Sequence, residues 1–226
     1  MQRKNDTDAM ESFNSLKNGS TDSSAIEAYY DDWAETYDQN LRDWNYKTPD
    51  EAAAALSEYL KPGAEVLDVG CGTGMFARAL SRYLDSHIEG IDISAVSLEI
   101  AGKQDSYDQL HRHDLQSTPL PLAENTFDAA ASIGVLTYIE DAAGLLEDLC
   151  RIVRPGGYIV FTQRDDRWAA YDFSVLINDF ETRGLWQPLL VSETKPYLPG
   201  NEEFGDSINV IHVLCRVQLQ PVVIDH

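Results

Sequence analysis

Basic residues are scarce in this chain. Seventeen lysines and arginines stand against 38 aspartates and glutamates, which gives a formal net charge of −21. A surface of that charge repels phosphate backbones, so the composition argues against a nucleic-acid partner. Solubility or adaptation to high salt explains the acidic excess more simply than a dedicated cationic substrate does. A local basic patch remains compatible with this total.

Long apolar runs and paired cysteines are also lacking. No stretch approaches the length of a membrane span, and no charged-then-apolar signal segment follows Met1, so we expect a cytoplasmic protein without a membrane partner. The three cysteines show no paired spacing or zinc motif, and Cys150 and Cys215 lie in apolar patterns typical of small buried side chains. His111 and His113 flank an expected strand with no further ligands nearby, which favours a surface pair over a metal site. We therefore expect no metal.

The chain divides into a polar tail and one domain. Residues 1–23 are rich in Ser, Asn and Asp and short of large apolar residues, which predicts a flexible tail. Residues 24–226 suffice for a single domain with a sizeable core. Within that domain, residues 24–60 are expected to form an N-terminal helical lid.

Two helices are marked at their ends within this lid segment. Ser24 followed by Glu27 predicts a capped start for the first helix. Thr48 as N-cap and Pro49 at the first helical position predict the start of the second, which should stop at residues 61–63.

From residue 65 onward, short apolar runs alternate with helical stretches. Strands are predicted at 65–69, 87–91, 109–113, 127–133, 158–163, 189–194 and 210–217, and helices at 75–84, 95–103, 142–152 and 173–183. This alternation is typical of an α/β fold, a seven-stranded, mostly parallel sheet with helices on both faces. The last two strands leave no room for a crossover helix, so the final strand should be antiparallel.

The strongest local signal is VLDVGCGTG, which ends at Gly74 and precedes an amphipathic stretch. A buried strand that ends in alternating glycines and opens a helix lets a ligand approach the backbone closely. A dinucleotide-binding loop, G-x-G-x-x-G, would need its third glycine where this chain has Met75. Asp68, two residues before Gly70, would oppose a pyrophosphate but could help to hold a cationic group. A nicotinamide-dependent oxidoreductase is therefore the less favoured interpretation.

Asp68-x-Gly70-x-Gly72-x-Gly74 resembles the first motif of the class I S-adenosylmethionine (SAM)-dependent methyltransferases. The resemblance implies a Rossmann-like fold and SAM as the cofactor. It also implies that this loop, including Cys71, wraps the methionine part of SAM while Asp68 reaches its ammonium, often through water.

The resemblance covers residues 29–161 and is similar to methyltransferase domains of types 11 and 25. Beyond it, residues 180–186 and the closing strand pair resemble the Williams–Beuren-region methyltransferase-like group more loosely. That closer likeness implies no particular methyl acceptor.

Two acids after the next strands extend the resemblance. Asp92 ends the second expected strand, where a carboxylate can accept both ribose hydroxyls of an adenosine cofactor. Alternatively, it only helps to cap the helix after Ser94. By resemblance, Ile93 packs on one adenine face, Leu115 covers the other, and Asp114 accepts from the adenine amino group. Asp114 could also be an ordinary loop acid.

The end of the fourth strand contributes the last cofactor residues. By resemblance, Ser132 and Ile133 border the methionine moiety of SAM. Many relatives carry a histidine soon afterwards, where this chain has Thr137 and Tyr138. Tyr138 is a candidate polar contact with the acceptor, but no general base is assigned and the catalytic residues stay unknown.

Aromatic side chains recur at helical spacing at Tyr29, Tyr30, Trp33 and Tyr37. Such a stripe most often packs in a core. It also resembles the lid that covers the sulfonium and shapes the acceptor pocket in many small-molecule methyltransferases. Tyr46 lies where relatives often place a residue near the cofactor. The acidic residues of this helix fall on the opposite face: Asp31, Asp32, Glu35 and Asp38.

Taken together, these residues predict an enzyme that transfers the SAM methyl group to an O, N, S or C atom of a small molecule. Two alternatives stay open: a catalytically silent module that binds SAM or S-adenosylhomocysteine (SAH) and acts through a partner, and, less favoured, the oxidoreductase. The sequence leaves the acceptor and the oligomeric state undetermined. Four aromatic residues after the fifth strand could line the acceptor pocket or fill the core: Trp168, Tyr171, Trp186 and Tyr197.

Overall fold

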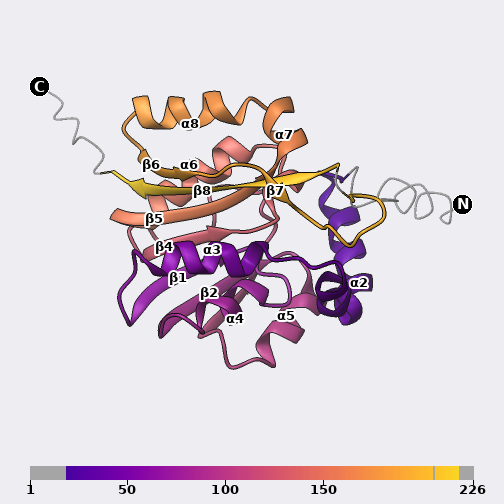
Figure 1. The fold of residues 1–226 in the computed structure, drawn as a ribbon. Coiled ribbons are helices and arrows are strands. Elements are labelled where there is room, and N and C mark those ends of the chain that lie inside the picture. Colours follow the sequence, from indigo (N-terminus) through magenta and orange to yellow (C-terminus); the bar gives the residue numbers. More distant parts are fainter. Residues whose placement is uncertain (1–18, 206, 219–226) are drawn as a thin grey trace, which may run out of the picture.

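The computed structural model describes residues 19–205 and 207–218, and its strands form one sheet (Figure 1). The strands are β1 (Ala64–Val69), β2 (Ser86–Asp92), β3 (Gln109–Arg112), β4 (Phe127–Ser132), β5 (Val153–Arg164), β6 (Trp186–Val191), β7 (Lys195–Pro196) and β8 (Asn209–Val217). The expected α/β class is confirmed, with eight strands instead of seven because the short β7 pairs with β8. Most of the predicted tail lies outside the described residues.

The order across the sheet is β3-β2-β1-β4-β5-β8-β6. Strands β1 to β5 run parallel, and β8 lies antiparallel between β5 and β6, which confirms the antiparallel end of the predicted sheet. The strand order reverses between β1 and β4, and ligand sites of such sheets form at the carboxyl ends of the strands beside this point. Strand β5 begins at Val153, earlier than the predicted residue 158.

Helices cover both faces of the sheet (Figure 1). They are α3 (Thr48–Ser57), α4 (Met75–Leu80), α5 (Ala95–Gly102), α6 (Ala142–Ile152), α7 (Asp165–Ala170) and α8 (Phe173–Thr182). Alternate residues of one strand face opposite sides, so Val66 packs with α3 and α4 while Leu67 packs with α6 and α8. Among the described residues, no helix is both long enough and apolar enough to cross a bilayer.

The N-terminal helices differ from their predicted form. Helix α2 (Ser23–Asp43) is capped by Asp22, whose side chain accepts from the Ala25 amide, and not by Ser24. Helix α3 begins with Thr48 inside the first turn, has no side-chain cap, and ends at Ser57 before the predicted stop.

Helix α3 belongs to the layer that packs on the sheet. Its residues Ala52, Ala53 and Leu56 are fully buried in the core formed with α4. Helix α2, by contrast, lies beyond the carboxyl ends of the parallel strands (Figure 1). Of the segment 24–60, only α2 is therefore placed to act as a lid.

Candidate functional site

Acidic residues at the ends of three neighbouring strands define the site. Asp68 lies near the end of β1, Asp92 ends β2, and Asp114 follows β3. Because these strands are parallel and adjacent, their carboxyl ends meet at one edge of the sheet. The structure thus brings together three residues that lie far apart in the sequence.

The glycine loop between β1 and α4 has backbone angles that favour glycine. Gly70, Gly72 and Gly74 have φ values of 72°, 51° and 89°, in the left-handed region. A Cβ atom on Gly70 would lie 2.3 Å from Val135 Cγ2, whereas one on Gly72 would meet nothing within 4 Å. Gly70 therefore permits close packing, and the backbone at Gly72 faces open space.

Asp92 joins this loop to the next helix. Its Oδ2 accepts from the Gly72 amide at 2.8 Å, and its Oδ1 accepts from the Ser94 amide at 2.8 Å. Ser94 is the N-cap of α5, because its hydroxyl accepts from the Ser97 amide. Asp92 is therefore not the cap but holds the capping residue in place. The Ile93 amide also acts as a donor to this carboxylate, and the remaining acceptor capacity is free. Burial raises the pKa of Asp92, and the backbone donors oppose that shift.

Asp68 is buried and has one side-chain partner. The Tyr107 hydroxyl donates to Asp68 Oδ2 at 2.7 Å. Burial raises the pKa of Asp68 to about 7, and the Tyr107 hydrogen bond acts in the opposite direction. The sequence analysis missed Tyr107, which comes from the segment before β3 and carries no motif.

Two acids of α2 hold this helix over the site. Asp31 Oδ1 accepts from the Ser94 hydroxyl at 2.6 Å. Asp38 accepts from the Thr73 hydroxyl at 2.5 Å and from Arg78 Nη2 at 2.5 Å. The sequence analysis placed both acids on the helix face opposite the aromatic stripe. In the structure they face the domain, because the glycine loop and the start of α5 present hydrogen-bond donors to them.

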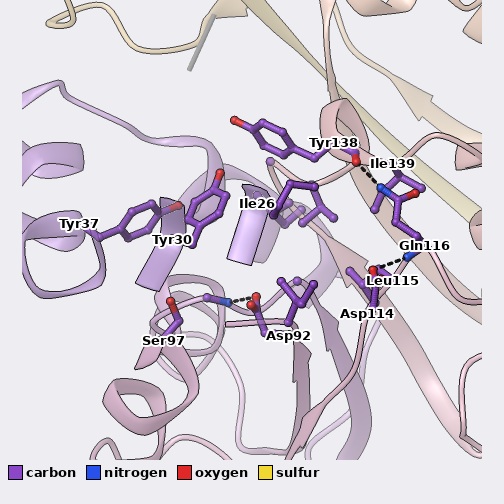
Figure 2. A pocket seen from close by; sticks show the side chains of 16 residues that line it. Ile26, Tyr30, Tyr37, Asp92, Ser97, Asp114, Leu115, Gln116, Tyr138 and Ile139 are labelled. Carbon is purple, nitrogen blue, oxygen red and sulfur yellow. Dashed lines mark hydrogen bonds between the residues drawn. The ribbon is translucent and has the colours of Figure 1, made fainter. Parts of the chain in front are cut away.

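The cavity at this edge has three adjacent lobes, and Tyr37 lines all of them. The acidic lobe, about 690 Å³, lies under α2 (Figure 2), and its lining includes Asp92, Ile93, Ser97, Asp114, Leu115 and Gln116. The loop lobe, about 340 Å³, is lined by Asp68, Gly70, Cys71, Gly72, Tyr46 and Ile133, among others.

The third lobe, about 330 Å³, is the aromatic lobe. Its lining includes Tyr30, Trp33, Tyr46, Tyr138, Tyr197 and Phe204. Burial raises the pKa of all these tyrosines above the ordinary phenol value, so their hydroxyls stay protonated near neutral pH. A protonated phenol is a hydrogen-bond donor and a poor general base.

Gly134, after β4, allows two of these phenols to approach the backbone. It has a φ of 76°, and a Cβ atom there would lie 2.9 Å from the Tyr46 hydroxyl and 3.2 Å from the Tyr197 hydroxyl. The sequence analysis did not select Gly134, although a glycine directly after a strand end is a usable signal.

Several selected residues lie outside the lining of the three lobes. Tyr29 packs against Tyr30, with ring centroids 5.5 Å apart. Gly74 is the N-cap of α4. Ser132 is fully buried at the end of β4, and its hydroxyl has no hydrogen-bond partner.

The later aromatic residues separate into different roles. Tyr197 lines the aromatic lobe, and Trp186 is buried in the core against Phe180. Trp168 stacks on Phe173, and Tyr171 is exposed. Gln116, which was not selected, lines the acidic lobe and donates to the Tyr138 carbonyl at 2.8 Å.

Charge is distributed unevenly around the cavity. Three carboxylates line the acidic and loop lobes, and among the described residues no Lys, Arg or His lines any of the three lobes. The described part of the chain also has no group of three or more His, Cys, Asp or Glu side chains placed to share a metal ion. The cavity is thus built to favour a positive charge.

Comparison with known proteins identifies the family. Residues 67–161 match a family model described as a methyltransferase domain. The chain is 32% identical to methyltransferase-like protein 27 of Homo sapiens over 169 residues, which are 72% of this chain and 68% of the relative. The chain belongs to the class I SAM-dependent methyltransferases. The family and enzyme class predicted from the glycine motif are therefore confirmed.

Two further proteins similar to this methyltransferase agree with that assignment. Dimethylglycine N-methyltransferase of Parasynechococcus marenigrum is 31% identical over 198 residues, which are 76% of this chain and 66% of the relative. A Haloferax volcanii methyltransferase, solved in complex with the Trm112 methyltransferase activator, shares the fold with a TM-score of 0.63 at 18% identity, covering 84% of this chain and 98% of that one.

The geometry at Gly134 predicts a difference between two glycine substitutions in this methyltransferase. Gly63→Ala, at a φ of 81° with nothing near its Cβ, should lower the free energy of unfolding by about 1–2 kcal/mol through strain alone. Gly134→Ala should lose roughly 1–3 kcal/mol more, because the methyl group meets two phenols. Urea unfolding measures both values. Equal losses would show that the phenols do not pack against Gly134.

Proposed function

We propose that this enzyme transfers the methyl group of SAM to a small-molecule acceptor. SAM would lie across the acidic and loop lobes, and the acceptor would enter the aromatic lobe. The observation that carries the proposal is the junction at Tyr37, where two acid-lined lobes meet an aromatic one. SAM carries a sulfonium and an ammonium against one carboxylate, so its net positive charge matches this lining.

The acidic lobe fits the adenosine part of SAM. The Asp92 carboxylate keeps acceptor capacity after its backbone bonds, which suits the ribose hydroxyls. Ile93 and Leu115 supply apolar surface for the adenine faces, and Asp114 can accept from the adenine amino group. All four residues line the same lobe.

The loop lobe fits the methionine part. Asp68 supplies a buried carboxylate for the ammonium, and the open backbone at Gly72 leaves space for the chain of the cofactor. Tyr46 and Ile133 also line this lobe. A pyrophosphate would place two negative charges beside Asp68 without a cationic side chain, which argues against a dinucleotide.

When bound, SAM supplies a methyl group already activated by the sulfonium. The chain then has to align the acceptor, exclude water and match charge. Tyr30 and Tyr37 lie on α2 above the cavity (Figure 2), where they can cover the cofactor while Asp31 and Asp38 hold the helix in place. We propose that α2 is the lid of this site.

Methyl transfer into fractionated cell extract tests the proposed function. With methyl-labelled SAM, we expect label in the small-molecule fraction of a nuclease- and protease-free extract. Label found only in precipitated protein or nucleic acid would contradict a small-molecule acceptor. SAH binding without transfer into any fraction would favour the silent binding module.

Replacing Asp92 tests the adenosine assignment. Asp92→Ala should weaken SAH binding by about 1.5–3 kcal/mol, because the ribose hydroxyls lose charge-assisted hydrogen bonds. Glu99→Gln is the control, since the exposed Glu99 of α5 pairs with the exposed Lys103. Calorimetric titration measures both affinities, and unchanged affinity of the Asp92 variant would remove this residue from its assigned role.

The pKa of Asp68 predicts a pH dependence of cofactor binding. Because that pKa is raised to about 7, Asp68 loses its charge as the pH falls through this value, and SAH affinity should fall with it. Tyr107→Phe removes the hydrogen bond that lowers the pKa, so the midpoint should move to higher pH. The exposed Tyr83→Phe is the control.

In the ligand-free protein, the contribution of Asp68 to the free energy of unfolding should rise as the pH falls, whereas SAH affinity falls. The folded pKa of Asp68 is raised above its value in the unfolded chain, so the ionised group destabilises the fold above about pH 7, and this penalty disappears as the pH falls. Titration of Asp68 itself therefore does not unfold the protein over the range in which binding is lost. A binding midpoint that ignores Tyr107→Phe would show that Asp68 does not contact the ammonium.

A further inference from the structure

The aromatic lobe differs from the other two lobes in its chemistry. Seven of its ten lining residues are aromatic, and the other three are Leu41, Leu198 and Gly134. None of the ten carries a carboxylate, imidazole, amine, guanidinium or thiol. An acceptor in this lobe therefore meets rings and phenol hydroxyls.

Most of those hydroxyls are already paired with one another. Tyr30 hydrogen-bonds Tyr138, and Tyr46 hydrogen-bonds Tyr197. The ring planes of these pairs are nearly perpendicular, at 84° for Tyr30 with Tyr138 and 88° for Tyr46 with Tyr197. Each pair thus presents a ring face beside a ring edge, and the faces carry the negative part of the aromatic quadrupole.

Charges of both signs act on the lobe. Asp92 and Asp38 act on Tyr37, at the junction of the lobes. Arg164 lies outside the lining, with its guanidinium 5.2 Å from the Phe204 ring centroid, and its charge acts to lower the pKa of Tyr138 and Tyr197. Two contacts to Asp166, at 3.0 Å and 2.7 Å, offset the charge of Arg164.

We propose that the methyl acceptor is a small tertiary amine, which the lobe retains as a quaternary ammonium product. This inference rests on the proposed function. The amine reacts as its free base, having left its proton in solvent before it enters the lobe. Its nitrogen lone pair forms the new N–C bond, and the electrons of the broken C–S bond stay on sulfur. The positive charge moves from sulfur to nitrogen, and aromatic rings stabilise such a cation by cation–π attraction.

Other acceptor classes fit the lobe less well. An alcohol or a phenol must lose its O–H proton on transfer, and no lining side chain of the lobe is a suitable base. A carboxylate acceptor would need a cationic partner, and no basic side chain lines the lobe. Any amine that enters as the free base needs neither, but only a tertiary amine gives a product whose positive charge is permanent.

A pair of probes with the same shape tests the preference for a cation. Choline and 3,3-dimethylbutan-1-ol differ in the charged nitrogen that replaces a carbon. On protein saturated with SAH, choline should bind about tenfold more tightly in calorimetric titration, because only choline gains cation–π attraction. Equal affinities would overturn the inference. Failure of SAH itself to bind would instead overturn the proposed function.

Two substitutions of Tyr197 locate the effect in the lobe. Tyr197 lines only the aromatic lobe, so SAH affinity should persist in both variants and reports correct folding. Tyr197→Leu removes the ring and should reduce the preference for choline about threefold or more, while Tyr197→Phe keeps the ring and the preference. A preference that survives Tyr197→Leu unchanged would contradict binding in this lobe.

The reaction gives an independent result. With SAM, dimethylethanolamine should be methylated to choline, and catechol should not react. Methylation of catechol in preference to dimethylethanolamine would overturn the assignment of the acceptor class, even if SAM binds as proposed.

Discussion

The site depends on one half-buried carboxylate that accepts from two segments of backbone. Asp92 binds the Gly72 amide with one oxygen and the Ser94 amide with the other. Ser94 in turn donates to Asp31 on α2, and Asp38 on the same helix accepts from Thr73, the neighbour of Gly72. These bonds form a closed ring through the loop, the start of α5 and α2. A charge removed from water is costly without such donors. The hydrogen bonds that the carboxylate requires therefore fix the geometry of the loop and of the start of α5.

Charge and apolar surface are divided between the lobes of one cavity. The carboxylates line the acidic and loop lobes, and the aromatic lobe has none. Tyr37 separates the two environments and contacts both. A ligand with a polar, cationic body and an apolar neighbour therefore has only one orientation in which each part meets a matching wall. This division of charge can orient a ligand without any residue that takes part in making or breaking a bond.

The parts of the fold and site that depend on local sequence could be predicted. Each strand end is encoded within a few residues of the acid beside it, at the ends of β1 and β2 and just after β3, and the glycine turn follows β1 directly. Contacts between distant segments could not be predicted: Tyr107 lies 39 residues from Asp68, and Phe204 comes from the segment between β7 and β8. The cap of α2 was assigned wrongly because Asp22 and Ser24 are both good capping residues, and only the three-dimensional structure decides between them.

The position of β8 has a consequence for how the sheet can be completed. This strand follows all others along the chain, yet it lies inside the sheet, hydrogen-bonded to β5 on one side and β6 on the other. During synthesis, the edges of β5 and β6 that pair with β8 stay without a partner until residues 209–217 have left the ribosome. Open strand edges promote aggregation. A chain interrupted before residue 209 would leave β5 and β6 without their shared partner, so the interval before β8 emerges is one in which this domain is prone to aggregation.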